Sequence, residues 1–309
     1  MKKNLLILSA LLLCALTITY ILIRGAEPDR IFTSYKRTYA KFKLQPIDTV
    51  LFPGRVSIMK AISGNIYVYV YSKKTVYRYD TRLHKIDSFF GRPDIIARME
   101  VDTSALYIFD DTETKIFTKG IPQSASYLIT SYNKTKKIAE LKLRNFNTSL
   151  DSTLHGFPYF EDGGLSADGF YTSNDAYHFY IPFYNSGMIR YDKQQHQVKL
   201  IHTIDKTLPS NIAVPTGNIY SRSSKSVIVN SAATADQQYL YVLSYVLSAD
   251  TDNYRGPAID VYNIEKGNYE GSFRLPGYQN LPVLQLSKRA DTLIAAYEKN
   301  ILLFKLTSL

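Results

Sequence analysis

The chain has no tryptophan and one cysteine, Cys14, which lies inside an apolar N-terminal run. A lone cysteine excludes an intramolecular disulfide and paired-thiol chemistry, so cysteine does not reveal the redox compartment. From Val56 onward no window shows a sustained helical period of apolar residues, which argues against a helical body. There is also no Gly-x-Ser-x-Gly elbow, which argues against an α/β-hydrolase partner domain.

What the chain has is tyrosine and positive charge. The 26 tyrosines suit half-buried strand positions, because tyrosine joins an apolar ring to a polar tip. The net charge of +10 is compatible with an anionic partner. However, lysines and arginines are spread singly through turns, and neither a recognition helix nor an RNA-binding signature is present. We therefore interpret the charge as a solvated basic surface and expect no nucleic-acid partner. Binding of an anionic polymer is the alternative.

Residues 1–24 read as a membrane segment. Lys2 and Lys3 precede Leu5–Ile23, an uncharged run whose helix would be roughly 28 Å long, close to the thickness of a bilayer core. A cleaved signal prefers small residues before the cleavage point, where this chain has Arg24. A lipoprotein signal prefers a small residue before Cys14, where this chain has leucine. An uncleaved signal-anchor fits best, with the body on the extracytoplasmic side, periplasmic or at the cell surface.

Residues 25–30 form a short linker, and 31–309 form the body. Ile31–Leu44 interleaves aromatics with lysine and arginine. It reads as the first strand of the body, with a juxtamembrane basic patch as the alternative.

The body shows a repeated pattern of apolar strand, short polar turn and second strand. Two copies within Tyr67–Phe117 lie about 39 residues apart, a period typical of toroidal or solenoid folds. Ile66–Tyr71 is apolar on both faces, which predicts a strand packed on both faces inside a propeller blade. Further strand-like runs include Val76–Tyr79, Ala105–Phe109, Tyr177–Phe183, Val227–Val229, Tyr239–Val246, Leu293–Tyr297 and Ile301–Leu306.

The segment Phe90–Phe117 carries a family resemblance. Gly91-Arg92-Pro93, then Val101-Asp102, then Leu106–Asp110, resembles the repeat of NHL-type and TolB-like six-bladed β-propellers. The resemblance implies an all-β propeller of four-stranded antiparallel meanders. At about 40–46 residues per blade the body would hold six blades, with seven as the alternative. Ile31–Leu44 would close the ring by pairing with Ile301–Leu306, since closure removes exposed edges.

The metal-binding motifs are weak. The five histidines lack metal-ligand spacing. Asp250 and Asp252 resemble the start of a calcium loop, which Tyr254 and Arg255 interrupt. A propeller lactonase would hold calcium with carboxylates at the channel ends of inner strands. We take Asp102, Asp168, Asp236 and Asp291 to precede such strands.

Two segments depart from the repeat, His155–Gly164 and Ser248–Pro257. Long propeller connections lie on the rims, where ligands and partners dock. We therefore hypothesise a recognition surface made of Phe157, Tyr159, Phe160, Glu161, Asp162, Asp250, Asp252, Tyr254 and Arg255.

The sequence thus predicts a membrane-tethered, extracytoplasmic β-propeller that binds a protein or cell-envelope ligand without catalysis. No cofactor is expected. The alternative is a hydrolase or lactonase with calcium in its central channel.

Overall fold

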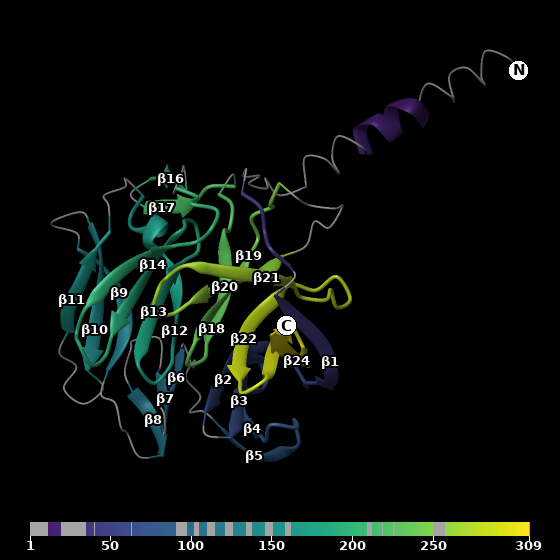
Figure 1. Ribbon diagram of the computed structural model, residues 1–309. Coiled ribbons are helices and arrows are strands. Elements are labelled where there is room, and N and C mark those ends of the chain that lie inside the picture. The colour runs from purple at the N-terminus through teal and green to yellow at the C-terminus, as the bar shows by residue number, and fades with distance from the viewer. Residues whose placement is uncertain are drawn as a thin grey trace, which may run out of the picture.

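The computed structural model describes residues 12–19, 35–39, 41–62, 64–90, 98–101, 105–109, 115–120, 126–133, 138–145, 151–157, 162–208, 212–217, 219–224, 226–249 and 257–308. These residues form a β-propeller, as the fold class predicted (Figure 1). Residues 12–19 are helical. No helix within the described ranges is both long and apolar enough to span a bilayer. The rest of the predicted membrane segment lies outside those ranges.

Four sheets have four antiparallel strands each. One holds β2 (Val56–Ile62), β3 (Asn65–Val70), β4 (Thr75–Tyr79) and β5 (Lys85–Phe90). A second holds β12 (Gly169–Ser173), β13 (Tyr177–Pro182), β14 (Gly187–Asp192) and β15 (Val198–His202). A third holds β18 (Asn230–Ala235), β19 (Tyr239–Ser244), β20 (Ala258–Asn263) and β21 (Tyr269–Arg274). The fourth holds β22 (Val283–Arg289), β23 (Thr292–Tyr297), β24 (Asn300–Ser308) and β1 (Phe42–Leu51).

The remaining sheets are smaller. Two have three strands: β6 (Arg98–Val101), β7 (Ala105–Phe109) and β8 (Lys115–Gly120), and β9 (Ser126–Asn133), β10 (Ile138–Asn145) and β11 (Asp151–Gly156). The prediction of four strands in every blade is therefore wrong for these two sheets as described. A hairpin of β16 (Ala213–Thr216) and β17 (Ile219–Arg222) stands apart. Five blades are formed in the described part of the chain, so the count of six stays a prediction.

Closure of the ring joins the two ends of the chain. Strand β1 pairs antiparallel with β24, from Phe42 opposite Ser308 to Leu51 opposite Asn300. Pairing of an N-terminal strand with the C-terminal strand is confirmed, but the predicted range was too early. The strand begins at Phe42, and residues 35–39 before it are not in a strand. Pro46 is tolerated because β1 is an edge strand and bulges next to it.

The hydrophobic core lies between neighbouring sheets. One cluster joins Leu243 of β19 to Leu293 of β23, and another joins Val68 of β3 to Leu303 of β24. Strand β3 is almost entirely buried, as its unbroken apolar run predicted. Strands β19 and β23 have the same burial pattern. By contrast, residues 227–229 precede β18 and are not in a strand.

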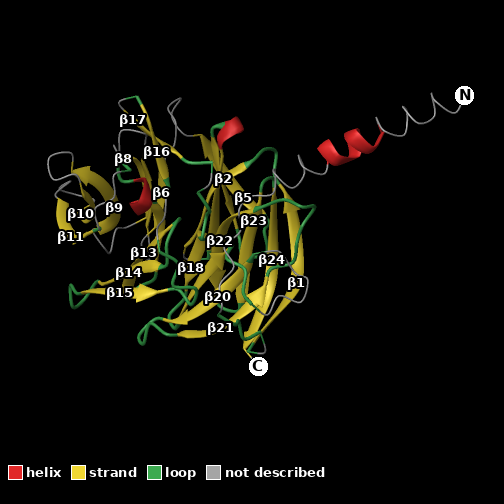
Figure 2. Ribbon diagram, turned by 90° about the horizontal axis from the view of Figure 1, so that it is seen from above, coloured by secondary structure: helices red, strands yellow, loops and turns green. Residues whose placement is uncertain are grey.

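The innermost strands define two ends of the propeller. Strands β6, β2, β22, β18 and β12 lie side by side in that order around the axis. We call the end at which β2, β12, β18 and β22 begin the upper rim, and the other end the lower rim. In Figure 2 the hairpin β16–β17 lies toward the upper end of the molecule and the C-terminus at the lower end.

The sheet β9–β11 departs from this arrangement. The 3-10 helix η2 (Leu165–Ala167) directly precedes β12 at the upper rim. A Cβ on Gly164, next to η2, would meet Tyr132 at the end of β9 and Ala139 at the start of β10. Strand β9 therefore ends where β12 begins and runs antiparallel to it. Among the described residues, this sheet therefore has no innermost strand that runs in the same direction as β2, β12, β18 and β22. Its strand β9 lines the central cavity instead.

Candidate functional site

The described ends of the two connections predicted to bind a ligand lie at the upper rim. The chain leaves β11 and reaches β12 there, through His155–Gly164. It leaves β19 and returns into β20 there, through Ser248–Pro257. Of the nine predicted site residues, Phe157 and Asp162 belong to the described part. Tyr159, Phe160, Glu161, Asp250, Asp252, Tyr254 and Arg255 lie outside it.

The two described residues make structural contacts. The ring of Phe157 packs 5.7 Å from that of Tyr180, and its backbone N–H donates to the carbonyl of Ala139 over 2.9 Å. The carboxylate of Asp162 is buried and accepts the N–H groups of Gly164 and Ser166 at 2.9 and 2.7 Å. Asp162 thereby fixes the turn into η2, in the way that an Asx side chain caps a turn. These two side chains fix the described ends of the connection that carries Tyr159, Phe160 and Glu161.

The four aspartates considered for calcium do not share one rim. Asp168 precedes the innermost strand β12, at the upper rim. Asp236 and Asp291 follow the innermost strands β18 and β22, at the lower rim. The reading that both precede such strands was wrong, because β18 is poor in large apolar residues and the following strand was taken as the inner one. Asp102 lies outside the described residues. Among the described residues, no cluster of three acidic, histidine or cysteine side chains could hold a metal.

A central cavity of about 740 Å³ runs between the inner strands. Its walls come from β2, β6, β9, β12, β18 and β22, with Arg144, Tyr180 and Phe183 behind β9 and β12. On one side of the cavity, residues 128–131 of β9 form part of the wall. Small and hydroxyl side chains dominate the wall of β18, which has the sequence NSAATA. Such residues leave space near the axis, where the blades converge.

Every charged side chain in the described wall of the cavity is a cation: Lys60, Arg144 and Lys288. Each of these cations lies beside a group that stabilises positive charge. The ammonium of Lys60 lies 5.0 Å from the ring centre of Tyr171, and Arg144 forms a bidentate ion pair with Asp151 at 2.7 and 2.9 Å. The side chain of Lys288 is 4% exposed, donates to the carbonyl of Ala290 and lies 3.7 Å from Asp236. Burial lowers the pKa of Lys288, and Asp236 opposes that shift.

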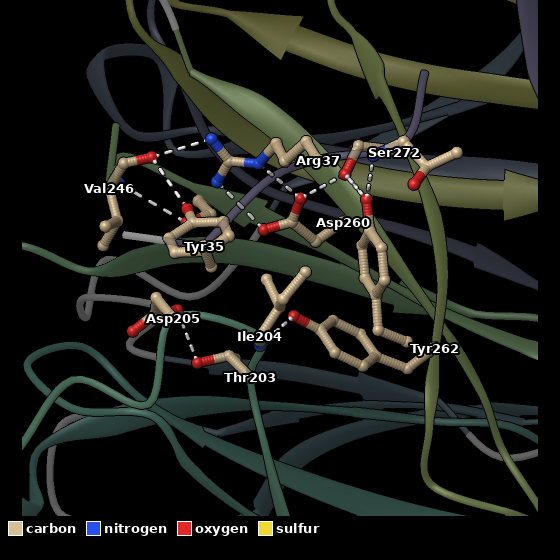
Figure 3. A network of polar contacts seen from close by, with 12 residues as sticks. Tyr35, Arg37, Thr203, Ile204, Asp205, Val246, Asp260, Tyr262 and Ser272 are labelled. Carbon is tan, nitrogen blue, oxygen red and sulfur yellow. Dashed lines mark hydrogen bonds and ion pairs between the residues drawn. The ribbon is translucent and has the colours of Figure 1, made fainter. Parts of the chain in front are cut away.

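A buried polar network fixes the N-terminal segment to the upper half of the propeller (Figure 3). Arg37 donates to both carboxylate oxygens of Asp260, at 2.7 and 3.0 Å, and to the carbonyl of Val246 at 2.8 Å. Ser272 donates to the same carboxylate at 2.6 Å. Burial alone would lower the pKa of Arg37, but the Asp260 carboxylate more than reverses this, so its pKa is raised. Nothing in the sequence pointed to this pair, because the two residues are 223 positions apart.

His178 is the histidine with unusual surroundings. It is 3% exposed and lies beside the rings of Tyr171 and Tyr191, and neither ring nitrogen has a hydrogen-bond partner among the described residues. Burial, followed by the charge of Lys193, holds its pKa well below the usual value. The ring is therefore neutral and belongs to the packing of β13 against β14.

Comparisons with known proteins identify no family for this chain and find likenesses to solved structures at low identity. No family model matches it, and no curated protein matches it in sequence. A solved structure of a Bacteroides fragilis protein inferred to be exported aligns over 90% of this chain and 99% of its own, at 10% identity and a TM-score of 0.48. A DUF4221 family member from Bacteroides vulgatus aligns over 87% and 99%, at 10% identity and a TM-score of 0.45. The WD40 repeats of RRP9 align over 88% and 99%, at 7% identity and a TM-score of 0.42. These likenesses say nothing about the ligand of this chain.

Proposed function

We propose that the protein is a membrane-tethered, extracytoplasmic β-propeller that binds a protein or cell-envelope ligand at its upper rim and performs no catalysis. The tether is the N-terminal segment 1–24, with Lys2 and Lys3 on the cytoplasmic side. The ring has six blades when β6–β8 and β9–β11 each count as one, in the manner of NHL-type and TolB-like propellers.

The observation that carries this proposal is the unequal length of the connections at the two rims. On the lower rim, adjacent strands are joined by short turns such as 80–84, 174–176 and 236–238. On the upper rim the connections 157–168, 203–229 and 245–257 are much longer. Turns that only reverse a strand need few residues, whereas long connections in a compact fold often carry function. The upper rim is therefore the face built for recognition.

The central cavity supports a binding role over the calcium-dependent alternative. A calcium ion needs six to eight oxygen ligands, several of them carboxylates. The described wall offers cations and hydroxyl groups instead. We therefore treat the cavity as part of the scaffold that spaces the blades.

Three experiments test the proposal. Protease treatment of intact cells or spheroplasts tests whether the propeller lies outside the cytoplasm. Alkaline extraction of membranes tests whether the N-terminal segment holds the protein in the bilayer. Resistance of the body to protease added outside would contradict the extracytoplasmic location, and release of the protein by alkali would contradict the membrane tether. Affinity capture tests the recognition surface by comparing the ligands bound by the natural chain with those bound by a variant carrying alanine at Tyr159, Glu161, Tyr254 and Arg255. An unchanged set of captured ligands would refute that surface.

A further inference from the structure

Exposed apolar side chains concentrate on the upper rim. In the described propeller, twelve large hydrophobic side chains are exposed. Four of the twelve surround the hairpin β16–β17: Leu208 at 78% exposure, Ile219 at 64%, Val214 at 45% and Tyr220 at 42%. Four more lie elsewhere on the same rim: Leu51, Tyr71, Tyr132 and Ile228. The other four are on outer strands away from this rim: Ile47, Ile86, Val198 and Leu200.

The hairpin contributes little to the core of the propeller. Most residues of its two strands are exposed, and its base is held by the N–H of Ser223 donating to Ile212 over 2.7 Å. Tyr220 packs against Gly163, where a φ of +65° requires glycine and where an added Cβ would lie 3.1 Å from the ring. The hairpin is thus positioned by backbone and loop contacts while its apolar side chains face outward. Large exposed apolar side chains gathered in and beside one hairpin are typical of an interaction site.

Among the described residues of the same rim, the exposed charges are mainly positive. Seven basic side chains are exposed there: Lys36, Arg55, Lys73, Lys74, Lys206, Arg222 and Lys299. Among the described residues of the rim, Asp168 is the one exposed carboxylate. The lower rim is mixed, with the exposed acids Asp175, Glu265 and Asp291 beside exposed lysines. A surface that is both apolar and basic matches the interface of an anionic bilayer, where apolar groups insert and cations meet headgroups.

The N-terminal segment reaches the body at this rim. The carbonyl of Tyr35 accepts the N–H of Ala249 over 3.0 Å, and the hydroxyl of Tyr35 donates to Val246 over 3.3 Å. Eleven residues, 24–34, separate Tyr35 from the apolar run Leu5–Ile23. Fully extended they span at most about 40 Å. A chain anchored by that run therefore keeps its upper rim within reach of the membrane surface.

We propose that the upper rim binds the surface of an anionic lipid bilayer, with Ile219 of the β16–β17 hairpin and Leu208, which precedes the hairpin, among the headgroups. This inference rests on the proposed tether, which sets the orientation of the propeller relative to the membrane. It identifies the proposed cell-envelope ligand of the upper rim as the lipid surface. The rim then lies on the membrane, and the lower rim faces away from it.

The absence of tryptophan allows a direct test with the full chain. Ile219→Trp and Ile86→Trp each introduce a single tryptophan, at 64% and 48% exposed positions on the upper rim and on β5 near the lower rim. Each variant is reconstituted into vesicles of phosphatidylcholine with phosphatidylglycerol or of phosphatidylcholine alone, with and without brominated acyl chains. The expected result is quenching and a blue shift for the Ile219 reporter in anionic vesicles, with neither change for the Ile86 reporter. Equal quenching of both reporters would overturn the proposal.

Charge variants test the electrostatic part on the same reporter. Each basic residue near an anionic surface is worth about 1 kcal/mol, so Lys206→Gln or Arg222→Gln should weaken rim contact roughly fivefold. Lys85→Gln, near the lower rim, is the matched control and should leave quenching unchanged. If Lys85→Gln reduced quenching as much as Lys206→Gln or Arg222→Gln, the proposal would also be contradicted.

Flotation of the same vesicles separates the two claims. Protein that floats while the Ile219 reporter stays unquenched shows that the tether holds and that the rim does not touch lipid, which refutes the rim proposal alone. Protein that does not float refutes the tether. Ile219 quenching that is equal with and without anionic lipid would refute the charge-based recognition.

Discussion

Replacing Arg37 with methionine tests whether the N-terminal segment is fixed to the propeller by one buried ion pair. Methionine keeps much of the length of the side chain and removes the guanidinium. The carboxylate of Asp260, which is fully buried, then keeps Ser272 but loses its counter-ion. Removing one partner of a buried pair costs about 3–5 kcal/mol, because an uncompensated charge is left in a poorly polarisable interior.

Urea unfolding followed by far-ultraviolet circular dichroism measures this loss. Strand β1 begins only five residues after Arg37, so release of the segment also weakens ring closure. Adding Asp260→Asn to the Arg37→Met variant removes the stranded charge and should recover part of the loss. In a double-mutant cycle the two substitutions should be strongly non-additive.

A second bidentate pair supplies the control. Arg144 and Asp151 have similar geometry but side chains that are 24% and 26% exposed, against 3% and 0% for Arg37 and Asp260. Solvent screening limits such a pair to about 0–1 kcal/mol, so Arg144→Met should cost far less. Equal losses for Arg37→Met and Arg144→Met would refute the argument that burial sets the cost.

Three further predictions concern pH, packing and metal. The depressed pKa of His178 means that the unfolded chain binds a proton near its ordinary pKa of 6.5 while the folded chain does not. Stability should therefore be full above that pH and fall below it by up to about 1.4 kcal/mol per pH unit, a slope that His178→Phe should reduce in unfolding curves between pH 7 and 5. A Cβ on Gly169 would lie 2.4 Å from the carbonyl oxygen of Ile181, so Gly169→Ala should lower the melting temperature markedly, whereas Gly277→Ala, with no atom within 4 Å, should not. Calcium should leave the melting temperature unchanged, and a calcium-dependent rise would support the lactonase alternative instead.

The sequence predicted the propeller because its second strands are easy to recognise. Strands such as β3 and β23 are packed on both faces, so they appear as unbroken apolar runs flanked by turn residues. The innermost strands were harder to find. Strand β18 is rich in alanine, serine and threonine, because residues near the axis have little space, and such a composition has no hydrophobic signal.

Strand direction and long-range ion pairs could not be predicted. Hydrophobic pattern is the same whichever way a strand runs, so nothing in the sequence indicated that β9 runs antiparallel to the innermost strands. The segment Ile31–Leu44 alternates aromatic and basic residues as an edge strand would. Arg37 turns inward to Asp260 instead, and the strand begins at Phe42. The recognition surface stays a prediction for the seven candidates outside the described residues.

The central claim is that the protein is a membrane-tethered propeller that binds its ligand at the upper rim. Site-specific photo-crosslinking in intact cells tests it most directly, with a photoreactive amino acid at Ile219 on the upper rim and, as the matched position, at Ile86 near the lower rim. The account predicts crosslinks to lipid or to another envelope component from position 219 and essentially none from position 86. Crosslinks that are equally abundant from both positions, or that come mainly from position 86, would contradict it.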